Sequence, residues 1–395
     1  MPLAISQHGT PGRTIMDDTA RLKDFLERTE ALSGLEEARY QRLIAELDRP
    51  VSREGYDRQD RFRIAMFDAK SYDLESFGRA NDGQFAIQPI ETALSVDTAA
   101  AAAGSKVVCI FVNDRCDEEV IERLASLGVE LIALRCAGFN NVDLAACAKH
   151  GISVARVPAY SPYAVAEHTV ALMLMLNRRL HQAYMRNRAG SFLLEGLTGF
   201  DMRNKTVGVI GTGKIGRCVI DILLGFGCEV LAYDKFQDDT VASYDHVRYV
   251  ELPELLANSD IVTLHIPLFP ETHHLIDAAA IEQMKPGVMV INTSRGGLVD
   301  TQALINGLKS ERIGFAGLDV YEEEAGIFFQ DLSAKVLTDD VLARLMTFNN
   351  VVVTSHQAFL TREALSNIAD TTLANVGEYL AGKRGSALTN AVSAE

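Results

Sequence analysis

The sequence lacks an excess of positive charge. Its 38 Lys and Arg residues stand against 53 Asp and Glu residues, which gives a formal net charge of −15. A protein that binds nucleic acid needs basic patches, and docking on an anionic membrane surface needs clustered Lys and Arg. The composition therefore argues against both kinds of partner. It does not bear on a small anionic substrate, because the local charge inside a cleft can oppose the global sign.

The sequence also lacks any pattern of paired cysteines. No two of its six cysteines are spaced as CxxC, and no Cys/His cluster has the spacing of zinc ligands. Several cysteines lie in apolar runs, such as Cys109 in VVCIFV. We therefore expect reduced thiols in the core, a reducing compartment and no metal site.

Long apolar runs and a secretory leader are missing as well. No run reaches the roughly eighteen residues that a membrane-spanning helix needs. The N-terminus has no basic segment followed by an apolar stretch, which a signal peptide would require. These absences predict a cytoplasmic protein without a membrane partner.

The remaining composition predicts two folded domains and an N-terminal extension. The chain has 395 residues, 48% of them hydrophobic, which is enough for a large core. The Gly, Pro, Ser and Thr residues of 1–16 indicate a loose tail. Leucines recur at helical spacing across 17–48, which favours a helical hairpin for packing or oligomerisation. A polar linker is expected at 49–61, so residues 1–61 form the predicted extension.

From residue 62 onward, short apolar runs alternate with helical stretches. This alternation predicts parallel sheets covered by helices on both faces. A first series occupies 62–161, and a long helix is expected from Pro162 to Arg188. A second series with more strands follows, and together with this helix it forms a predicted domain over 162–356. The segment 357–395, with a helix at about 362–380, is expected to return to the first domain.

A glycine-rich turn at the start of the second series predicts a dinucleotide site. Gly211, Gly213 and Gly216 follow an apolar strand directly and open a helix. In this motif the glycines allow a tight turn, a close approach of a pyrophosphate, and close packing of helix on strand. The next strand ends at Asp234, where a carboxylate can bind ribose hydroxyls and repel a 2′-phosphate. The sequence therefore favours NAD over NADP.

Three later strand ends carry an arginine, a run of acids and a histidine. Arg295 follows one strand, the acidic run 322–324 follows the next, and His356 follows the last. Because ligands of open α/β sheets lie outside the carboxyl ends of the strands, these groups are expected to converge. Arg can bind a carboxylate with two hydrogen bonds, and His transfers protons near neutral pH. A neighbouring carboxylate favours imidazolium, so the set suits reduction of a 2-keto acid.

Nine motifs carry a resemblance to a known family. From about residue 63 to about 382 the chain resembles the D-2-hydroxyacid dehydrogenases, in particular their fermentative D-lactate branch. The segment FFQDLS at 328–333 resembles the corresponding segment of that branch. The other motifs are RCAGFNNVDL (135–144), VPAYSPYAVAEH (157–168), NRRLHQAYMRNR (177–188), EGLTGFDM (195–202), GTGKIG, NTSRGGLVD, GLDVYEEE and SHQAFLT. The first sixty residues or so have no counterpart that resembles the family.

The resemblance implies a fold and a role for individual residues. The implied fold class is α/β: an NAD-binding Rossmann domain and a smaller flavodoxin-like substrate domain, preceded by the N-terminal helical extension. Glu324, rather than Glu322 or Glu323, is the implied partner of His356, which is the implied acid/base. The residues implied to contact the cofactor, besides the three glycines, are Lys214, Ile215, Asp234, Ile266, Pro267, Thr272, Thr293, Ser294 and Asp319. Those implied to bind the substrate are Ala137, Gly138, Tyr160, Arg295 and Phe359.

These features predict an NAD-dependent enzyme that interconverts pyruvate and D-lactate. One alternative is a related enzyme that acts on a bulkier 2-keto acid, such as phenylpyruvate or 2-ketoisocaproate. A second alternative is a non-catalytic NAD sensor that binds protein partners, although such a protein has no need for Arg295, Glu324 and His356 together. A homo-oligomer, dimer or tetramer, is expected.

Overall fold

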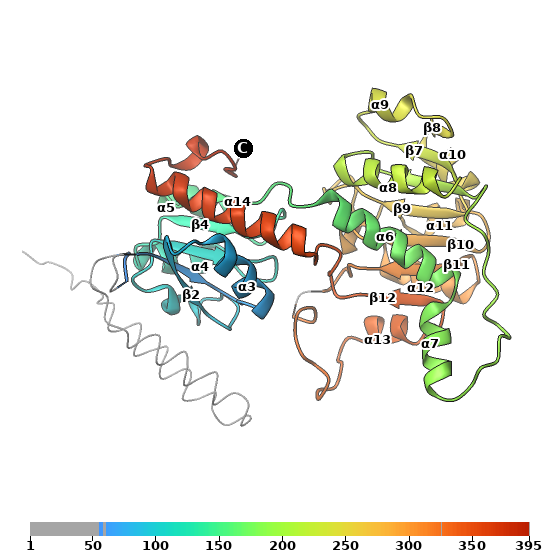
Figure 1. Ribbon diagram of the computed structural model, residues 1–395, viewed down its shortest axis with the longest axis horizontal. Coiled ribbons are helices and arrows are strands. Elements are labelled where there is room, and N and C mark those ends of the chain that lie inside the picture. The colour runs from blue at the N-terminus through green and yellow to red at the C-terminus, as the bar shows by residue number, and fades with distance from the viewer. Residues whose placement is uncertain (1–54, 58–60, 325, 395) are drawn as a thin grey trace, which may run out of the picture. The chain divides into compact units, whose positions relative to one another are not determined.

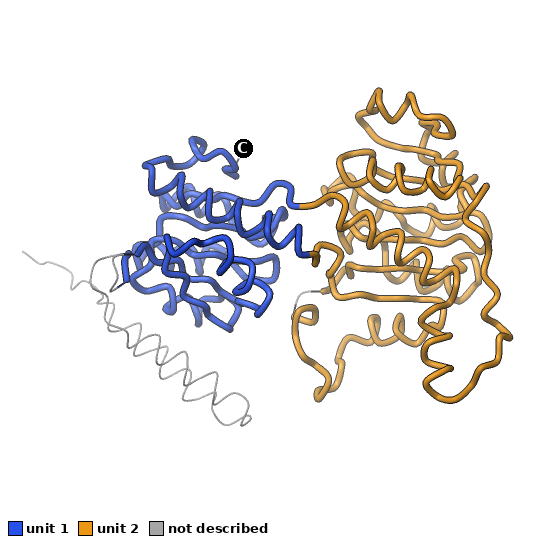
Figure 2. The backbone as a smooth tube through the Cα atoms, in the orientation of Figure 1, with its two compact units in different colours: residues 1–160, 362–395 blue, residues 161–361 orange. Residues whose placement is uncertain are grey.

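The computed structural model describes residues 55–57, 61–324 and 326–394. The predicted tail, the helical extension and most of the predicted linker lie outside the described residues. The chain divides into two units, which Figure 2 colours separately. The first unit runs up to Tyr160 and resumes at Arg362, and the second spans Ser161–Thr361. The polypeptide therefore passes between the units twice.

The first unit is built on a five-stranded sheet in the order β2-β1-β3-β4-β5, with every strand pairing parallel. This is the strand order of flavodoxin-like sheets. The C-terminal helix α14 packs on α3 and β4, so the end of the chain completes this unit (Figure 1). The strands are β1 (Phe62–Met66), β2 (Phe85–Pro89), β3 (Val107–Ile110), β4 (Leu131–Leu134) and β5 (Ser153–Ala155). The helices are α3 (Ser71–Ala80), η2 (Ala99–Ala102), α4 (Glu118–Ser126), α5 (Leu144–His150), α14 (Arg362–Leu380) and η4 (Gly385–Ala387).

The second unit contains a seven-stranded parallel sheet in the order β12-β11-β10-β9-β6-β7-β8. Its order reverses between β6 and β9, as in dinucleotide-binding sheets. The strands are β6 (Thr206–Ile210), β7 (Glu229–Tyr233), β8 (Val247–Tyr249), β9 (Ile261–Leu264), β10 (Val288–Asn292), β11 (Ile313–Leu318) and β12 (Val351–Val353). The helices are α6 (Pro162–Asn177), α7 (Leu180–Arg188), α8 (Lys214–Gly225), α9 (Asp239–Ala242), α10 (Leu252–Asn258), α11 (Ala278–Gln283), η3 (Gly296–Leu298), α12 (Thr301–Lys309) and α13 (Asp340–Met346).

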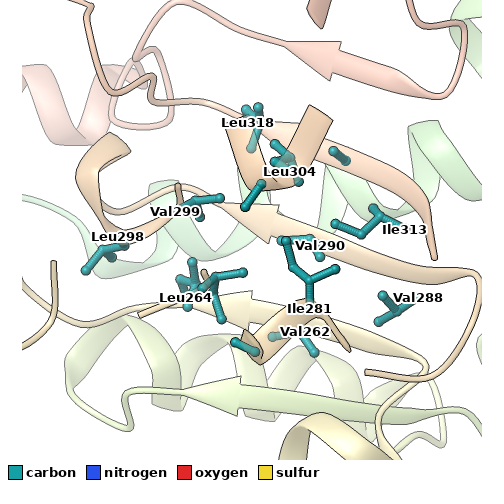
Figure 3. Close-up of a cluster of buried hydrophobic side chains, with 14 of the residues drawn as sticks. Val262, Leu264, Ile281, Val288, Val290, Leu298, Val299, Leu304, Ile313 and Leu318 are labelled. Atoms are coloured by element: carbon teal, nitrogen blue, oxygen red, sulfur yellow. The ribbon is translucent and has the colours of Figure 1, made fainter. Parts of the chain in front are cut away.

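Two cores cover the two faces of the second sheet, and the alternation of side chains along the strands divides them. Val288 and Val290 of β10 pack with Ile281 of α11 and Leu304 of α12 (Figure 3). The next residue along, Met289, packs with residues of α6 and α8 on the opposite face. Because successive strand residues point to opposite faces, a continuous apolar run such as VMVI serves both cores. The two cores thereby hold the sheet from both faces, and polar loops follow the ends of its strands.

Polar side chains mark the starts of the helices. Ser161 accepts a hydrogen bond from the N–H of Ala164 at the start of α6, where Pro162 takes the first helical position. An aspartate accepts the equivalent bond at α4, α5, α9, α11, α12 and α13. Such caps satisfy N–H groups that have no partner inside the helix. These helices therefore begin where the sequence places a short polar residue.

The helix expected from Pro162 to Arg188 is wrong as a single helix. Arg179 adopts a left-handed backbone conformation, with φ of 49°, and separates α6 from α7. Both side-chain groups of Asn177 bind the backbone of Phe200, at 2.7 and 2.8 Å. The end of α6 is therefore tied to the chain that returns past it, which a pattern of apolar spacing does not reveal. The helix expected at 362–380 is confirmed as α14.

Two further expectations concern the cysteines and the membrane. All six cysteines are buried and unbonded to one another, as the apolar runs around them predict. Among the described residues, no helix is both long enough and apolar enough to cross a bilayer.

Candidate active site

The arginine, the acidic run and the histidine lie at the ends of neighbouring strands. Arg295 follows β10, Glu324 lies in the loop after β11, and His356 follows β12, and these strands are adjacent and parallel. Nδ1 of His356 lies 2.9 Å from Oε1 of Glu324. Arg295 instead donates to the carbonyl oxygen of Ser294, at 2.7 Å. Among the described residues Arg295 forms no ion pair, so its charge is available to an anionic ligand.

The contact with Glu324 orients the imidazole of His356. Oε2 of Glu324 also accepts the backbone N–H of Tyr321, at 3.1 Å, which fixes the carboxylate. An ionised carboxylate can only accept, so Nδ1 of His356 carries the hydrogen and Nε2 is left for a ligand. The side chain of His356 is 18% exposed. The geometry therefore presents one ring nitrogen of a partly buried histidine for proton transfer.

A buried aspartate shapes the loop that carries His356. The carboxylate of Asp319 accepts the hydroxyl of Thr354 at 2.6 Å and the N–H groups of Gln357 and Ala358, each at 2.9 Å. The carbonyl oxygen of Asp319 accepts the N–H of His356, at 2.7 Å. Burial alone would raise the pKa of Asp319, but hydrogen bonds from His168, Thr354 and the two N–H groups lower it below its usual value. Asp319 is fully buried, and it anchors the residues on both sides of His356, which itself has a positive φ of 52°.

The three consecutive glutamates have three different environments. Glu324 contacts His356, as described above. Glu323 is exposed to solvent. Glu322 points elsewhere and contacts Nε2 of His274 at 2.5 Å and the hydroxyl of Thr301 at 2.9 Å. Glu324 is thus the glutamate of this run that pairs with His356.

The glycine turn has the shape that a bound pyrophosphate requires. Gly211 has a positive φ of 98°, and a Cβ there would lie 2.6 Å from the carbonyl oxygen of His265. A Cβ on Gly216 would lie 2.0 Å from the carbonyl oxygen of Gly211. By contrast, a Cβ on Gly213 would meet nothing within 4 Å. Two of the glycines are therefore required by packing, and the third leaves open space at the start of α8.

The acid at the end of β7 is linked to this turn. Oδ2 of Asp234 accepts the N–H of Thr212 at 2.7 Å, and its Oδ1 accepts the N–H of Phe236 at 2.9 Å. The hydroxyl of Tyr249 donates to Oγ1 of Thr212, at 2.7 Å. Sequence reasoning did not identify Thr212 or Tyr249. Thr212 stands between two motif glycines and could have been noted, whereas Tyr249 lies on β8, which the pattern of apolar runs missed.

The other residues implied to contact the cofactor lie at the start of α8 or on loops that follow the carboxyl ends of the strands. Lys214 and Ile215 begin α8, and Ile266 and Pro267 follow β9. The hydroxyl of Thr272 donates to the carbonyl of Pro267. Thr293 and Ser294 follow β10, where Thr293 bonds to Thr169 of α6 and Ser294 to the carbonyl of Ile266. These loops hold one another in place through hydroxyl groups.

The residues implied to bind the substrate are divided between the two units. Ala137 and Gly138 follow β4 in the first unit, which also contains Tyr160, whereas Phe359 is buried in the second. The carbonyl of Ala137 accepts Nη1 of Arg156, at 2.8 Å. Among the described residues, the N–H groups of Ala137 and Gly138 have no hydrogen-bond partner. Two consecutive N–H groups are thus available to an anion.

Comparisons with known proteins agree with this arrangement. The NAD binding domain of the D-isomer specific 2-hydroxyacid dehydrogenases matches residues 170–358. The D-lactate dehydrogenase of Escherichia coli is 50% identical over 322 residues, which cover 81% of this chain and 98% of that protein. The chain belongs to the D-isomer specific 2-hydroxyacid dehydrogenase family.

Solved structures of this dehydrogenase family extend the match. The structure of the pyruvate reductase of Chlamydomonas reinhardtii matches with a TM-score of 0.80 and 47% identity, covering 84% of this chain and 98% of that one. The D-lactate dehydrogenase of Aquifex aeolicus, solved with NAD and lactic acid, matches with a TM-score of 0.72 and 33% identity, covering 81% and 96%. The chain is therefore an NAD-dependent dehydrogenase with a Rossmann domain.

The open space beside Gly213 gives a prediction for this dehydrogenase. Gly213→Ala is expected to leave the thermal unfolding midpoint unchanged but to weaken NADH binding about tenfold, because the new methyl group occupies the space that the pyrophosphate needs. Gly225→Ala, at another open position on α8, is the matched control and is expected to bind NADH normally. Titrating NADH fluorescence measures both affinities. Equal affinities in the two variants would contradict this role for Gly213.

Proposed function

We propose that this chain is an NAD-dependent D-lactate dehydrogenase that reversibly reduces pyruvate with NADH. The observation that supports this most strongly is the contact of 2.9 Å between Nδ1 of His356 and Glu324, on a strand end that neighbours the one carrying Arg295. An oriented proton donor and a guanidinium that forms no ion pair among the described residues are what a small 2-keto acid requires. The similarity to D-lactate dehydrogenases supports the choice of substrate.

Each group of the site has a defined task in the proposed reaction. Bound NADH supplies the hydride. Arg295 binds the carboxylate of pyruvate with two hydrogen bonds and orients the keto group. Nε2 of the protonated His356 donates its proton to the carbonyl oxygen, while Glu324 stabilises the imidazolium and fixes the ring. In the reverse direction, neutral His356 accepts the hydroxyl proton of D-lactate.

The remaining candidate residues are proposed to bind and orient. The N–H groups of Ala137 and Gly138 are suited to the carboxylate of the substrate, and Tyr160 and Phe359 to its small methyl group. Asp234, at the end of β7, suits the ribose hydroxyls of NAD. The further residues proposed to contact the cofactor are Gly211, Gly213, Lys214, Ile215, Gly216, Ile266, Pro267, Thr272, Thr293, Ser294 and Asp319.

A comparison of two substrates tests the proposal. Purified protein is expected to show a much higher kcat/KM for pyruvate than for phenylpyruvate, measured by the oxidation of NADH. A preference for phenylpyruvate, or for 2-ketoisocaproate, would assign the chain to a bulkier acid instead. A protein that binds NADH but reduces none of these acids would be a non-catalytic NAD sensor instead of an enzyme.

A patch of exposed apolar side chains supports a homo-oligomer. Tyr184 and Met185 on α7 are 61% and 65% exposed, and Phe192, Leu193 and Leu194 in the segment that follows are 66–77% exposed. Figure 1 shows that this segment runs back along the second unit after α7. Apolar patches of this kind mark protein interfaces. We propose a second copy of this chain as the occupant, in a dimer or a tetramer.

Charges placed in this patch are expected to reduce the oligomer to smaller species. The double substitution Phe192→Asp and Leu194→Asp should lower the mass measured by light scattering after size exclusion, because two desolvated carboxylates disfavour the interface. Val336→Asp is the control, since Val336 is 86% exposed and lies outside the patch. A mass unaffected by the double substitution would refute the proposed interface.

A cytoplasmic location is proposed as well. All six cysteines are buried and unbonded, which suits a compartment that keeps thiols reduced. The proposed partner is a small 2-keto or 2-hydroxy acid substrate, and neither nucleic acid nor membrane is a proposed partner.

A further inference from the structure

Two histidines and a glutamate form a cluster apart from the proposed catalytic residues. His273 and His274 belong to the loop between β9 and α11, and Glu322 belongs to the loop after β11. One nitrogen of each ring and one oxygen of the carboxylate all lie within 4.8 Å of one another. The two imidazoles stack, with centroids 3.8 Å apart and an angle of 28° between their planes. Three groups that ligate metal ions are thus already gathered.

The backbone and neighbouring groups hold this cluster in place. The N–H of His274 donates to the carbonyl of Gly297 at 2.8 Å, and His274 has a positive φ of 53°. Glu322 accepts the hydroxyl of Thr301 at 2.9 Å through one oxygen and contacts His274 through the other. These contacts hold the carboxylate of Glu322 beside the two imidazoles, where one of its oxygens can serve as a ligand.

We propose that His273, His274 and Glu322 bind a divalent transition-metal ion of the Zn²⁺ type. Imidazole nitrogens suit Zn²⁺ and Ni²⁺, and two histidines with one carboxylate form a common three-residue set that leaves a position for water. Tetrahedral coordination with zinc–ligand distances of about 2.0–2.2 Å requires Nε2 of His274 and Oε1 of Glu322 to separate from 2.5 Å to about 3.4 Å. Side chains that are 32% and 24% exposed can make this adjustment.

Sequence spacing alone does not predict this site. The histidines are adjacent in the sequence, and Glu322 lies 48 residues after His274, so no ligand motif is visible. The fold brings them together because β9, β10 and β11 are neighbours in one parallel sheet, and both loops follow their carboxyl ends. The cluster is separate from the proposed reaction, since Glu324, and not Glu322, contacts His356.

Binding of zinc to the full chain, without an affinity tag, tests the site. After treatment with a chelator, isothermal titration with Zn²⁺ is expected to give one site with a dissociation constant on the order of 10 μM. Zn²⁺ should also raise the thermal unfolding midpoint, because a ligand that binds the folded state stabilises it. Mg²⁺ should do neither, since it prefers oxygen ligands. Absence of Zn²⁺ binding up to about 1 mM would overturn the proposal.

Two histidine variants locate the site. His273→Gln removes an exposed ligand and is expected to weaken Zn²⁺ binding at least tenfold and to abolish the thermal shift. His246→Gln is the control, because His246 is likewise exposed and pairs with Glu229 at 2.9 Å, but it belongs to no such cluster among the described residues. Equal zinc affinity of His273→Gln and the unsubstituted chain would overturn the assignment.

An anomalous diffraction measurement gives an answer that does not depend on any variant. Crystals soaked in Zn²⁺ and measured at the zinc absorption edge are expected to show a peak between His273, His274 and Glu322. A zinc peak elsewhere, with none at these three side chains, would overturn the proposal even if a variant failed to fold.

Discussion

Replacing His356 with Ala is expected to lower kcat for pyruvate by about 10²–10⁴-fold, which is the usual contribution of a positioned general acid. The keto oxygen must gain a proton as the hydride reaches the adjacent carbon, and Nε2 of His356 is the proposed donor. Binding of NADH should be nearly unchanged, because the glycine turn lies after β6 and His356 lies after β12, at the far edge of the same sheet. Stopped-flow and steady-state oxidation of NADH measure the loss.

The control for this experiment is a histidine–glutamate pair elsewhere in the same unit. His246 contacts Glu229 at 2.9 Å but is 66% exposed, so His246→Gln is expected to keep full activity. Undiminished turnover in His356→Ala would contradict the proposed role of His356 as the proton donor. A loss of NADH binding as large as the loss of kcat would show that His356 acts through the cofactor site instead.

The second large effect is expected from Asp319→Asn. The carboxylate of Asp319 accepts a hydroxyl and two N–H groups around His356, whereas an amide oxygen can replace only one of the two acceptor oxygens. The amide NH₂ would then face N–H donors inside a fully buried site. We expect a loss of about 2–4 kcal/mol in the free energy of unfolding and a fall in kcat, because the loop of His356 loses its anchor.

The pH dependence of this loss tests its cause. Because the folded-state pKa of Asp319 is lowered, its ionised form contributes stability that is present above the unfolded pKa of about 3.9. This contribution disappears as the pH falls through the lower, folded-state pKa. The difference in unfolding free energy between the unsubstituted chain and Asp319→Asn should therefore be largest at neutral pH and shrink in acid. A difference independent of pH would contradict the role of the charge.

A milder substitution in the same network provides the control. Thr354→Val removes the hydroxyl that donates to Asp319 at 2.6 Å but leaves the two N–H donors and the charge in place. Its effects on stability and on kcat are expected to be clearly smaller than those of Asp319→Asn. Denaturant unfolding at several pH values compares the two variants.

The strands that carry the site were predictable because they are buried on both faces. Runs such as VMVIN of β10 and TVGVI of β6 are continuous and apolar, and the polar residues that follow them mark the strand ends. The glycine turn was recognisable for the same reason, since its residues are adjacent in the sequence. Local sequence patterns and the parallel topology were therefore enough to predict that Arg295, Glu324 and His356 follow the carboxyl ends of neighbouring strands.

Features that depend on distant contacts were not visible in the sequence. The edge strands β2 and β8 have no continuous apolar run that would predict them, because FAIQP and VRY are short and only partly buried. The end of α6 at Asn177 is held by a contact with Phe200, which lies 23 residues away. The anchoring of the His356 loop by Asp319 likewise joins residues that are 35–39 positions apart. Local periodicity contains no information on such pairs.

The proposed function requires that this dehydrogenase form D-lactate from pyruvate. Incubating the purified protein with pyruvate and NADH, and resolving the product by chiral chromatography, tests it most directly. We expect one D-lactate for each NADH oxidised and no L-lactate. Formation of L-lactate, or bound NADH that pyruvate does not oxidise, would contradict it.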